Sequence, residues 1–253
     1  MKIDEMELNL TEKGAYGQYR KVLDAVQDNS PIKYMMAMSE TSREQGFSED
    51  LVFVGGLGVL GNIVHSYGVE AIPKSRGMHD VDLILNLPTC LGGLESVLDN
   101  PDIKKSCSIP NQYTLSGKSR DYSGETHNVF VDIYVPGRVH AFDDYLSRKV
   151  TSDFFGVKVN VLNPLDALRR KLAVNCMNGD TPREKDQQDI YNLLAVLENQ
   201  GYSPKQVRKE IFPGNAPDGK QLKLFSGILE NMKKKDFQRI SRVSGKFIRG
   251  LKK

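Results

Sequence analysis

The sequence has few of the residues and segments typical of secreted or membrane proteins. Only three of its 253 residues are cysteines, Cys90, Cys107 and Cys176, and they lie far apart and are odd in number. This spacing supports neither a disulfide framework nor a zinc site and favours a reducing compartment. No run of 18 apolar residues is present, so no membrane-spanning helix is predicted. The acidic N-terminus, MKIDEMELNLTEKG, does not have the pattern of a signal peptide, so we expect a cytoplasmic protein.

The chain also has little net charge, which excludes a uniformly basic or acidic protein. Its formal charge is +3, but residues 232–253, called the basic tail below, carry nine Lys or Arg and one Asp. A tail of +8 in a chain of +3 leaves −5 for the other residues. A local basic segment of this kind can bind the phosphates of RNA, although such a segment is more often only a solvated helix face.

The pattern of apolar residues predicts three parts. Residues 1–48 are predicted to form an N-terminal helical segment, with two helical pieces between about 11 and 46. Residues 49–162 combine β-branched and aromatic strands with helices, including a helix over 89–100. Residues 163–253 have only helical patterns and end in the basic tail. The predicted fold class is therefore α/β (α+β): a small mixed sheet with flanking helices, followed by a helical C-terminal domain.

Two acidic residues interrupt a segment that otherwise has the pattern of a buried strand. In HDVDLILN, Asp80 and Asp82 would project from one face of the strand while Val81 and Leu83 point into the core. The two carboxylates repel each other unless they share a cation, and oxygen-only ligands suit Mg²⁺ or Mn²⁺. Taken alone, this alternation is more often found in a solvated edge strand.

A third acidic residue, Asp132 in VFVDIYV, lies between apolar neighbours, where an isolated charge is least expected. If its strand is adjacent to the first, the three acids converge and can hold two metal ions that grip a nucleoside triphosphate and activate a hydroxyl. Taken alone, a buried Asp132 could instead cap a turn or pair with an arginine.

A glycine pair precedes these acids. Gly55 and Gly56 follow the apolar segment DLVFV and begin a helical pattern. A strand-to-helix turn without side chains lets backbone N–H groups and the helix N-terminus approach phosphate oxygens. Arg76, shortly before Asp80, is placed to neutralise phosphate charge. Together these residues predict a nucleotide-binding site.

These residues resemble the motifs of nucleotidyltransferases of the DNA polymerase β-like superfamily, most closely those of the AbiEii-type abortive-infection toxins. The resemblance rests on a glycine pair after a strand, an acid-x-acid strand preceded by an arginine, and a later third acid. In the helical part, the family's D-x-x-x-x-K element matches DALRRK, residues 166–171, and its R-x-x-K-D element is approximated by REKD, residues 183–186. The match covers roughly residues 51–197. This chain departs from the family in having Gly-Gly where Gly-Ser is common.

The resemblance implies an Mg²⁺-dependent or Mn²⁺-dependent enzyme that transfers NMP from an NTP to a hydroxyl. The implied metal ligands and catalytic acids are Asp80, Asp82 and Asp132. The implied contacts to the triphosphate are Gly55, Gly56, Arg76 and Lys171, with Asp186 or Asp189 orienting Lys171. The resemblance also implies an RNA acceptor, such as the 3′ end of a tRNA, contacted through the basic tail, and an antitoxin partner if the protein is a toxin.

Several alternatives remain open at the level of the sequence. Helical periodicity places Arg169 and Lys171 on opposite flanks of an apolar stripe, so it does not decide which of them contacts phosphates. In the next helix, expected from about Pro182, periodicity places Arg183 and Asp186 on the inward face. The acceptor could also be a protein or an aminoglycoside-like molecule. The rival hypothesis is a catalytically inactive protein that binds nucleotide or RNA and acts as a regulator.

Overall fold

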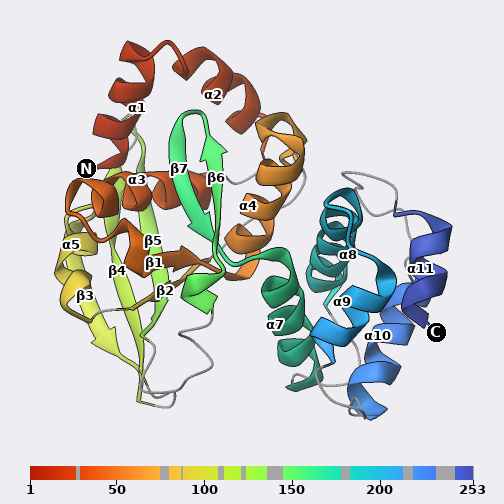
Figure 1. The fold of residues 1–253 in the computed structure, drawn as a ribbon. Coiled ribbons are helices and arrows are strands. Elements are labelled where there is room, and N and C mark those ends of the chain that lie inside the picture. Colours follow the sequence, from red (N-terminus) through yellow and green to blue (C-terminus); the bar gives the residue numbers. More distant parts are fainter. Residues whose placement is uncertain are drawn as a thin grey trace. The chain divides into compact units, whose positions relative to one another are not determined.

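The structure is a computed structural model of the 253-residue chain (Figure 1). The residues that it describes are 1–26, 29–74, 80–86, 88–107, 111–120, 124–135, 145–177, 183–212, 219–231 and 243–252. The chain divides into two compact units, Met1–Leu162 and Asn163–Lys253. The first unit contains a mixed β-sheet with helices, and the second is helical, which confirms the predicted fold class.

Three helices precede the sheet: α1 (Ile3–Glu12), α2 (Tyr16–Leu23) and α3 (Ser30–Glu44). The sequence predicted two helical pieces beginning near Thr11, so α1 was missed. Its buried residues Ile3, Met6 and Leu10 have helical spacing, but they are separated by acidic residues that mask the short apolar stripe. Pro31 lies in the first turn of α3, where its missing N–H costs no hydrogen bond.

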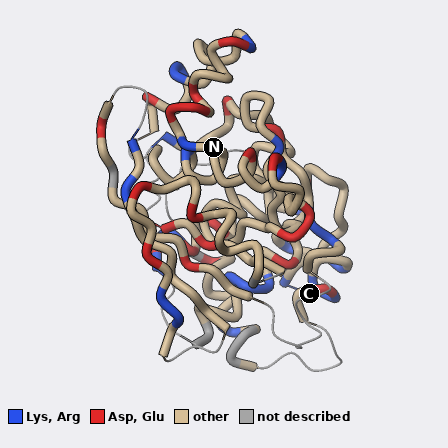
Figure 2. The backbone as a smooth tube through the Cα atoms, turned by 90° about the vertical axis from the view of Figure 1, so that its left-hand side faces the viewer, with Lys and Arg blue, Asp and Glu red and all other residues tan. Residues whose placement is uncertain are grey.

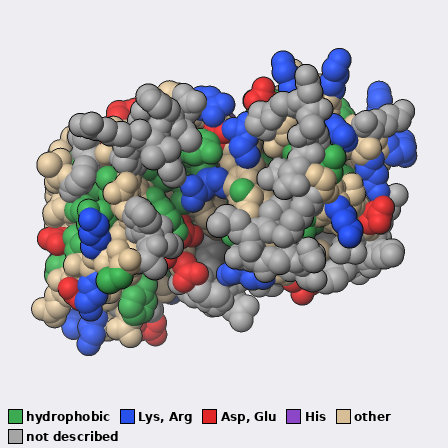
Figure 3. All heavy atoms as spheres, turned by 90° about the horizontal axis from the view of Figure 1, so that it is seen from below, with side chains coloured by type: hydrophobic (Ala, Val, Ile, Leu, Met, Phe, Trp, Pro, Cys, Tyr) green, Lys and Arg blue, Asp and Glu red, His purple; other side chains and the backbone are tan. Residues whose placement is uncertain are grey.

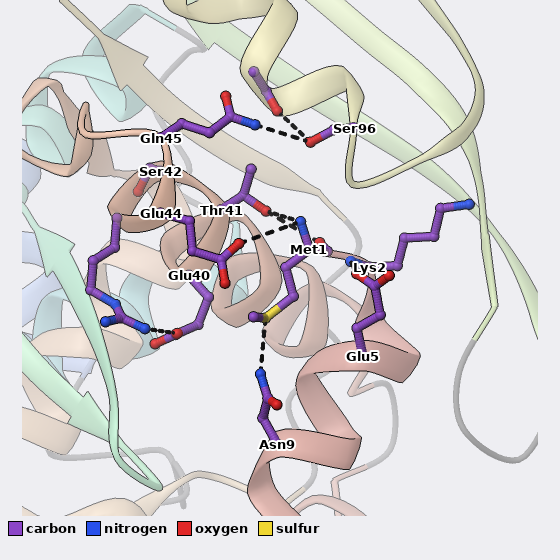
Figure 4. Close-up of polar contacts among 12 residues, drawn as sticks. Met1, Lys2, Glu5, Asn9, Glu40, Thr41, Ser42, Glu44, Gln45 and Ser96 are labelled. Atoms are coloured by element: carbon purple, nitrogen blue, oxygen red, sulfur yellow. Dashed lines mark hydrogen bonds and ion pairs between the residues drawn. The ribbon is translucent and has the colours of Figure 1, made fainter.

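Polar contacts join α1 to α3 (Figure 4). The Met1 amino group donates to Oγ1 of Thr41 over 2.9 Å. A second link is buried, because Nζ of Lys33 lies 3.2 Å from Oε1 of Glu7 and both side chains are largely removed from solvent. Residues 1–48 therefore pack within the first unit. Lys and Arg are interspersed with Asp and Glu along the backbone (Figure 2).

In the described part of the chain, seven strands form one sheet in the order β3-β4-β5-β2-β1-β7-β6. The strands are β1 (Leu51–Phe53), β2 (Val81–Leu85), β3 (Asp99–Lys105), β4 (Gln112–Arg120), β5 (Thr126–Tyr134), β6 (Val150–Phe154) and β7 (Val157–Val161). The pairs β2–β5 and β1–β7 are parallel and the other pairs are antiparallel. Short 3₁₀ helices, η1 (Ser48–Asp50), η2 (Val69–Ala71) and η3 (Pro88–Cys90), occupy some of the connections.

The helix predicted over residues 89–100 is shorter than expected. The 3₁₀ helix η3 and α5 (Leu91–Glu95) cover its first part, and the edge strand β3 begins at Asp99. Pro101 lies in β3, where the pairing with β4 shifts register between Asp99 and Asp102. An edge strand tolerates proline, because it pairs with a neighbouring strand on one side only and the missing N–H can lie on the solvent side.

One face of the sheet packs against α3 and α4 (Gly55–Tyr67). The alternate residues of β1, β2 and β5 enter this core, including Phe53, Leu83 and Val131. Helix α4 lies very close to β7, because a Cβ at Gly61 would be 2.3 Å from Cγ1 of Val161. The other face of the central strands carries the polar residues described in the next section.

The second unit contains α7 (Pro164–Met177), α8 (Glu184–Asn199), α9 (Pro204–Ile211), α10 (Gly219–Asn231) and α11 (Gly245–Lys252). The start of α11 is held on α8, because the N–H of Val243 donates to the Tyr191 hydroxyl over 3.1 Å. Of the basic tail, the structure describes residues 243–252. No helix among the described residues is long and apolar enough to cross a membrane.

Candidate active site

Two of the predicted acids are register partners on neighbouring parallel strands. Asp82 of β2 pairs with Asp132 of β5. Register partners on adjacent strands lie about 5 Å apart and point to the same face of the sheet. The flanking pair Val81 and Val131 is buried in the core on the opposite face. Both carboxylates are half-buried. The strands are therefore adjacent, and they place Asp82 beside Asp132.

The glycine turn lies directly against this acid pair. The N–H of Val54 donates to the carbonyl of Asp82 over 2.9 Å, which holds the end of β1 on β2. Gly55 has φ +58°, and a Cβ at this position would lie 2.1 Å from Oδ2 of Asp82. Only glycine fits both the left-handed backbone and the close approach of the carboxylate. The Asp82 carboxylate thus packs against the backbone where α4 begins.

The start of α4 carries backbone N–H groups that find no acceptor within the helix itself. The helix has no side-chain cap. Its first backbone hydrogen bond runs from the N–H of Gly58 to the carbonyl of Val54 over 2.8 Å, so the N–H groups before Gly58 have no acceptor within the helix. Gly56 lies in this first turn. These N–H groups and the helix dipole favour an anion at this end.

Asp132 is held from its other side by a residue that sequence analysis missed. Thr114 of β4 is its register partner, and the Thr114 hydroxyl donates to Oδ1 of Asp132 over 3.0 Å. The two strands form a hairpin-like antiparallel pair, but the sequence alone does not fix which threonine or serine opposes Asp132. The hydrogen bond fixes the orientation of the carboxylate. A row of residues from Gly55 through Asp82 and Asp132 to Thr114 therefore crosses three strands and the start of α4.

The remaining predicted residues of this site are Asp80 and Arg76. Asp80 immediately precedes β2 and is exposed. Among the described residues, no group of three or more His, Cys, Asp or Glu side chains is arranged to hold a metal ion. Arg76 lies outside the described residues, as does His79 beside it. The sheet itself therefore brings together two of the three predicted acids.

In the second unit, Lys171 lies between two buried carboxylates. Its Nζ is 2.9 Å from Oδ1 of Asp186 and 2.7 Å from Oδ2 of Asp189. The two aspartates are 1% and 0% exposed, and the lysine is 15% exposed. Burial alone raises the pKa of Asp186, but Lys171 and Arg183 outweigh burial and bring this pKa below its usual value. We call Lys171, Arg183, Asp186 and Asp189 the Lys171 cluster.

Arg169 of α7 has other partners than this cluster. Arg169 pairs with the buried Asp166, with 3.4 Å between Nη1 and Oδ1, and its Nε donates to the carbonyl of Glu210 over 3.1 Å. It therefore joins α7 to α9.

Arg183 was expected on the inward face of α8, and that prediction is wrong. Helix α8 begins at Glu184, so the helical period does not set the direction of the Arg183 side chain. This side chain is 57% exposed and its Nε donates to Oδ2 of Asp186 over 2.7 Å.

No protein-family model matches the chain, and no curated protein matches it. Some solved structures are similar to it. An antigenic nucleotidyltransferase-like protein from Paracoccidioides brasiliensis has a TM-score of 0.49 and 14% identity over 79% of this chain and 89% of that chain. The antibiotic-resistance factor ANT(2'')-Ia has a TM-score of 0.47 and 9% identity over 73% and 91% of the two chains.

The polyadenylate synthase of Megavirus has a TM-score of 0.44 and 16% identity over 76% of this chain and 37% of that chain. Likenesses with TM-scores of 0.44 to 0.49 assign neither a family nor an activity to this chain. Its function therefore has to follow from its own residues.

Proposed function

We propose that the protein transfers a nucleoside monophosphate from an NTP to a hydroxyl group. The observation that carries this proposal is the register pair of Asp82 and Asp132 beside Gly55, at the uncapped start of α4. Two half-buried carboxylates side by side suit a cation, and the neighbouring N–H groups suit phosphate. A nucleoside triphosphate bound with a divalent cation satisfies both.

The donor set fits Mg²⁺ or Mn²⁺ as the proposed cofactor. Its atoms are carboxylate oxygens, which these ions prefer. Asp82 and Asp132 would hold the ion, and Asp80, which is exposed next to β2, would complete the set. When bound, such an ion would neutralise phosphate charge and make the acceptor hydroxyl more acidic.

The chain's own residues have distinct roles in the proposed reaction. Backbone N–H groups of Gly55 and Gly56 donate to the triphosphate oxygens, and Arg76 neutralises their charge. Asp132, oriented by Thr114, accepts the proton of the acceptor hydroxyl. The hydroxyl oxygen then forms a bond to the α-phosphorus while the bond to the β-phosphate oxygen breaks, and pyrophosphate leaves. Most of the catalysis is positioning and charge stabilisation.

Lys171 is a further proposed contact to the triphosphate. The support for this role is its orientation by two buried aspartates, Asp186 and Asp189, which hold its ammonium group in place. Arg169 donates to the backbone carbonyl of Glu210 and so links α7 to α9, and we assign it to the packing of the second unit.

The proposed acceptor is the 3′ end of an RNA such as a tRNA. The support is the basic tail, which carries nine Lys or Arg and can bind RNA phosphates. We also propose that the protein is the toxin of a toxin–antitoxin or abortive-infection system, with an antitoxin protein as its partner. Expression that does not arrest the growth of the host cell would contradict the toxin role alone.

A label-transfer assay tests the proposed reaction. The protein is incubated with each α-³²P-labelled NTP, Mg²⁺ and total RNA, and labelled RNA is separated on a gel. Label transfer should disappear in Asp82→Asn and in Asp132→Asn. It should persist in the control Asp24→Asn, whose exposed carboxylate pairs with Arg20 on α2. RNA binding without label transfer by the wild type would instead support the inactive, regulatory alternative.

A further inference from the structure

We infer that Phe130 is a stacking platform for the terminal nucleobase of the RNA acceptor. This inference rests on the proposed function and names a substrate contact for the same site. Phe130 lies on β5, two residues before Asp132, so both side chains leave the same face of the sheet. It is 63% exposed, and among the described residues the other large hydrophobic side chains that are exposed are Leu8 and Val174.

The neighbours of Phe130 leave its ring uncovered. Its register partner on β4 is the small residue Ser116, whose hydroxyl donates to the carbonyl of Asp102 over 3.4 Å. On the other side of β5, the pairing with β2 begins at Val81 and Val131. One residue earlier on each strand, Asp80 is the neighbour of Phe130, and Asp80 is exposed. Figure 3 shows that hydrophobic side chains reach the surface of the sheet-bearing unit among charged ones. An aromatic ring in this position can bind a flat partner by stacking.

The position of Phe130 favours the base of the acceptor over the base of the NTP. In the row that crosses the sheet, Gly55 and the start of α4 lie next to Asp82, and Asp132 lies on the far side of Asp82. The triphosphate is therefore expected beside β1 and β2, and the acceptor hydroxyl beside β5. Residues i and i+2 on a strand are about 6.6 Å apart. This separation is comparable to the span from the 3′ hydroxyl of a nucleotide to its own base.

Stacking also explains the choice of an aromatic residue. A base stacks on an aromatic ring without regard to its hydrogen-bonding pattern, so the contact would position many RNA ends without selecting their sequence. An aliphatic side chain at residue 130 would offer apolar area but no flat π-face. The ring would hold the terminal nucleotide while Asp132 accepts the proton from its hydroxyl.

Two measurements with a short oligoribonucleotide test this inference. Fluorescence anisotropy measures binding of a fluorescein-labelled oligoribonucleotide with a free 3′ hydroxyl, which requires no catalysis. Label transfer measures KM for the same oligoribonucleotide and for the NTP. We expect Phe130→Ala to weaken oligoribonucleotide binding and raise its KM roughly 10-fold, with an unchanged KM for the NTP. Phe130→Tyr should behave as the wild type, and Phe130→Leu should resemble Phe130→Ala.

The controls separate stacking from general loss of apolar surface. Leu8→Ala removes another exposed apolar side chain, on α1, and should change neither the binding of the oligoribonucleotide nor its KM. An oligoribonucleotide that ends in an abasic ribose should bind the wild type weakly, and Phe130→Ala should weaken it no further.

The inference is overturned if Phe130→Ala binds the oligoribonucleotide as tightly as the wild type, or if only the KM for the NTP rises. If binding depends on Phe130 but the wild type transfers no label, the stacking contact to RNA stands and the proposed function fails.

Discussion

Replacing Gly55 with alanine tests the closest contact of the candidate site. The new Cβ would lie 2.1 Å from Oδ2 of Asp82, and the residue has φ +58°. A left-handed L residue costs about 1–2 kcal/mol. Overpacking against a fixed neighbour costs about 1–3 kcal/mol. Together they predict that Gly55→Ala lowers the free energy of unfolding by about 2–5 kcal/mol. Because relief of the clash requires the Asp82 carboxylate to turn away, label transfer should fall by about 100-fold or more, the size of effect seen when a transition-state contact is lost.

The assay combines urea unfolding with label transfer in three matched alanine variants. Gly17→Ala lies in α2 with no atom within 4 Å of its new Cβ, so it should be neutral or slightly stabilising. Gly61→Ala would meet Cγ1 of Val161 at 2.3 Å, so it should be destabilised while the folded protein still transfers label.

A double variant isolates the contact itself. Gly55→Ala with Asp82→Ala removes the carboxylate that the new methyl group meets, so it should regain much of the stability lost to overpacking. The backbone cost and a tight contact of 3.1 Å with the Cβ of residue 82 would remain. The reasoning is refuted if Gly55→Ala is as stable and as active as the wild type, or if removal of the Asp82 carboxylate restores no stability.

Three further predictions concern Asp132 and the second unit. Thr114→Val removes the hydrogen bond to Asp132 and should lower kcat roughly 10-fold, with Thr114→Ser close to wild type; equal kcat for all three would contradict the role of Thr114. Lys171→Ala leaves two buried aspartates without their lysine, so it should lower the free energy of unfolding by about 3–5 kcal/mol and raise the KM for the NTP. Arg169→Ala should change stability only. If Arg169→Ala raised the KM for the NTP and Lys171→Ala did not, Arg169 and not Lys171 would contact the triphosphate. Because the pKa of Asp186 lies below its usual value, the stability that its ionised form contributes is present above the unfolded pKa of about 3.9 and is lost as pH falls through the lower, folded pKa. The urea midpoint of the wild type should therefore fall more steeply below pH 4 than that of Asp186→Asn, and parallel curves would contradict this role of Asp186.

The sequence predicted those parts of the site that depend on local alternation. Asp82 between Val81 and Leu83 has the period of a strand with one buried face, and the structure has β2 there with both apolar residues in the core. The glycine pair after an apolar segment correctly indicated a strand followed by a helix, β1 and α4. Periodicity also correctly placed Asp186 on a buried face of α8.

Other features depend on contacts between distant parts of the chain. The pairing of Asp82 with Asp132 and the hydrogen bond of Asp132 with Thr114 are matters of strand order and register, which local patterns do not fix. The strand β3 was not predicted, and its first two residues were placed at the end of a helix, because its polar sequence lacks the alternation of a half-buried strand. It forms by pairing with β4. Arg183 was misplaced because α8 begins at Glu184 and not near Pro182, so the helical period does not constrain the direction of its side chain.

The most direct test of the account is the binding of Mn²⁺ by the acid pair, measured by electron paramagnetic resonance in the presence of a non-hydrolysable NTP analogue. The wild type and Asp24→Asn should bind Mn²⁺, and binding should be lost in Asp82→Asn and in Asp132→Asn, because each removes a carboxylate ligand. Unchanged binding in the double variant Asp82→Asn with Asp132→Asn would contradict the central claim that these two aspartates hold the metal and nucleotide.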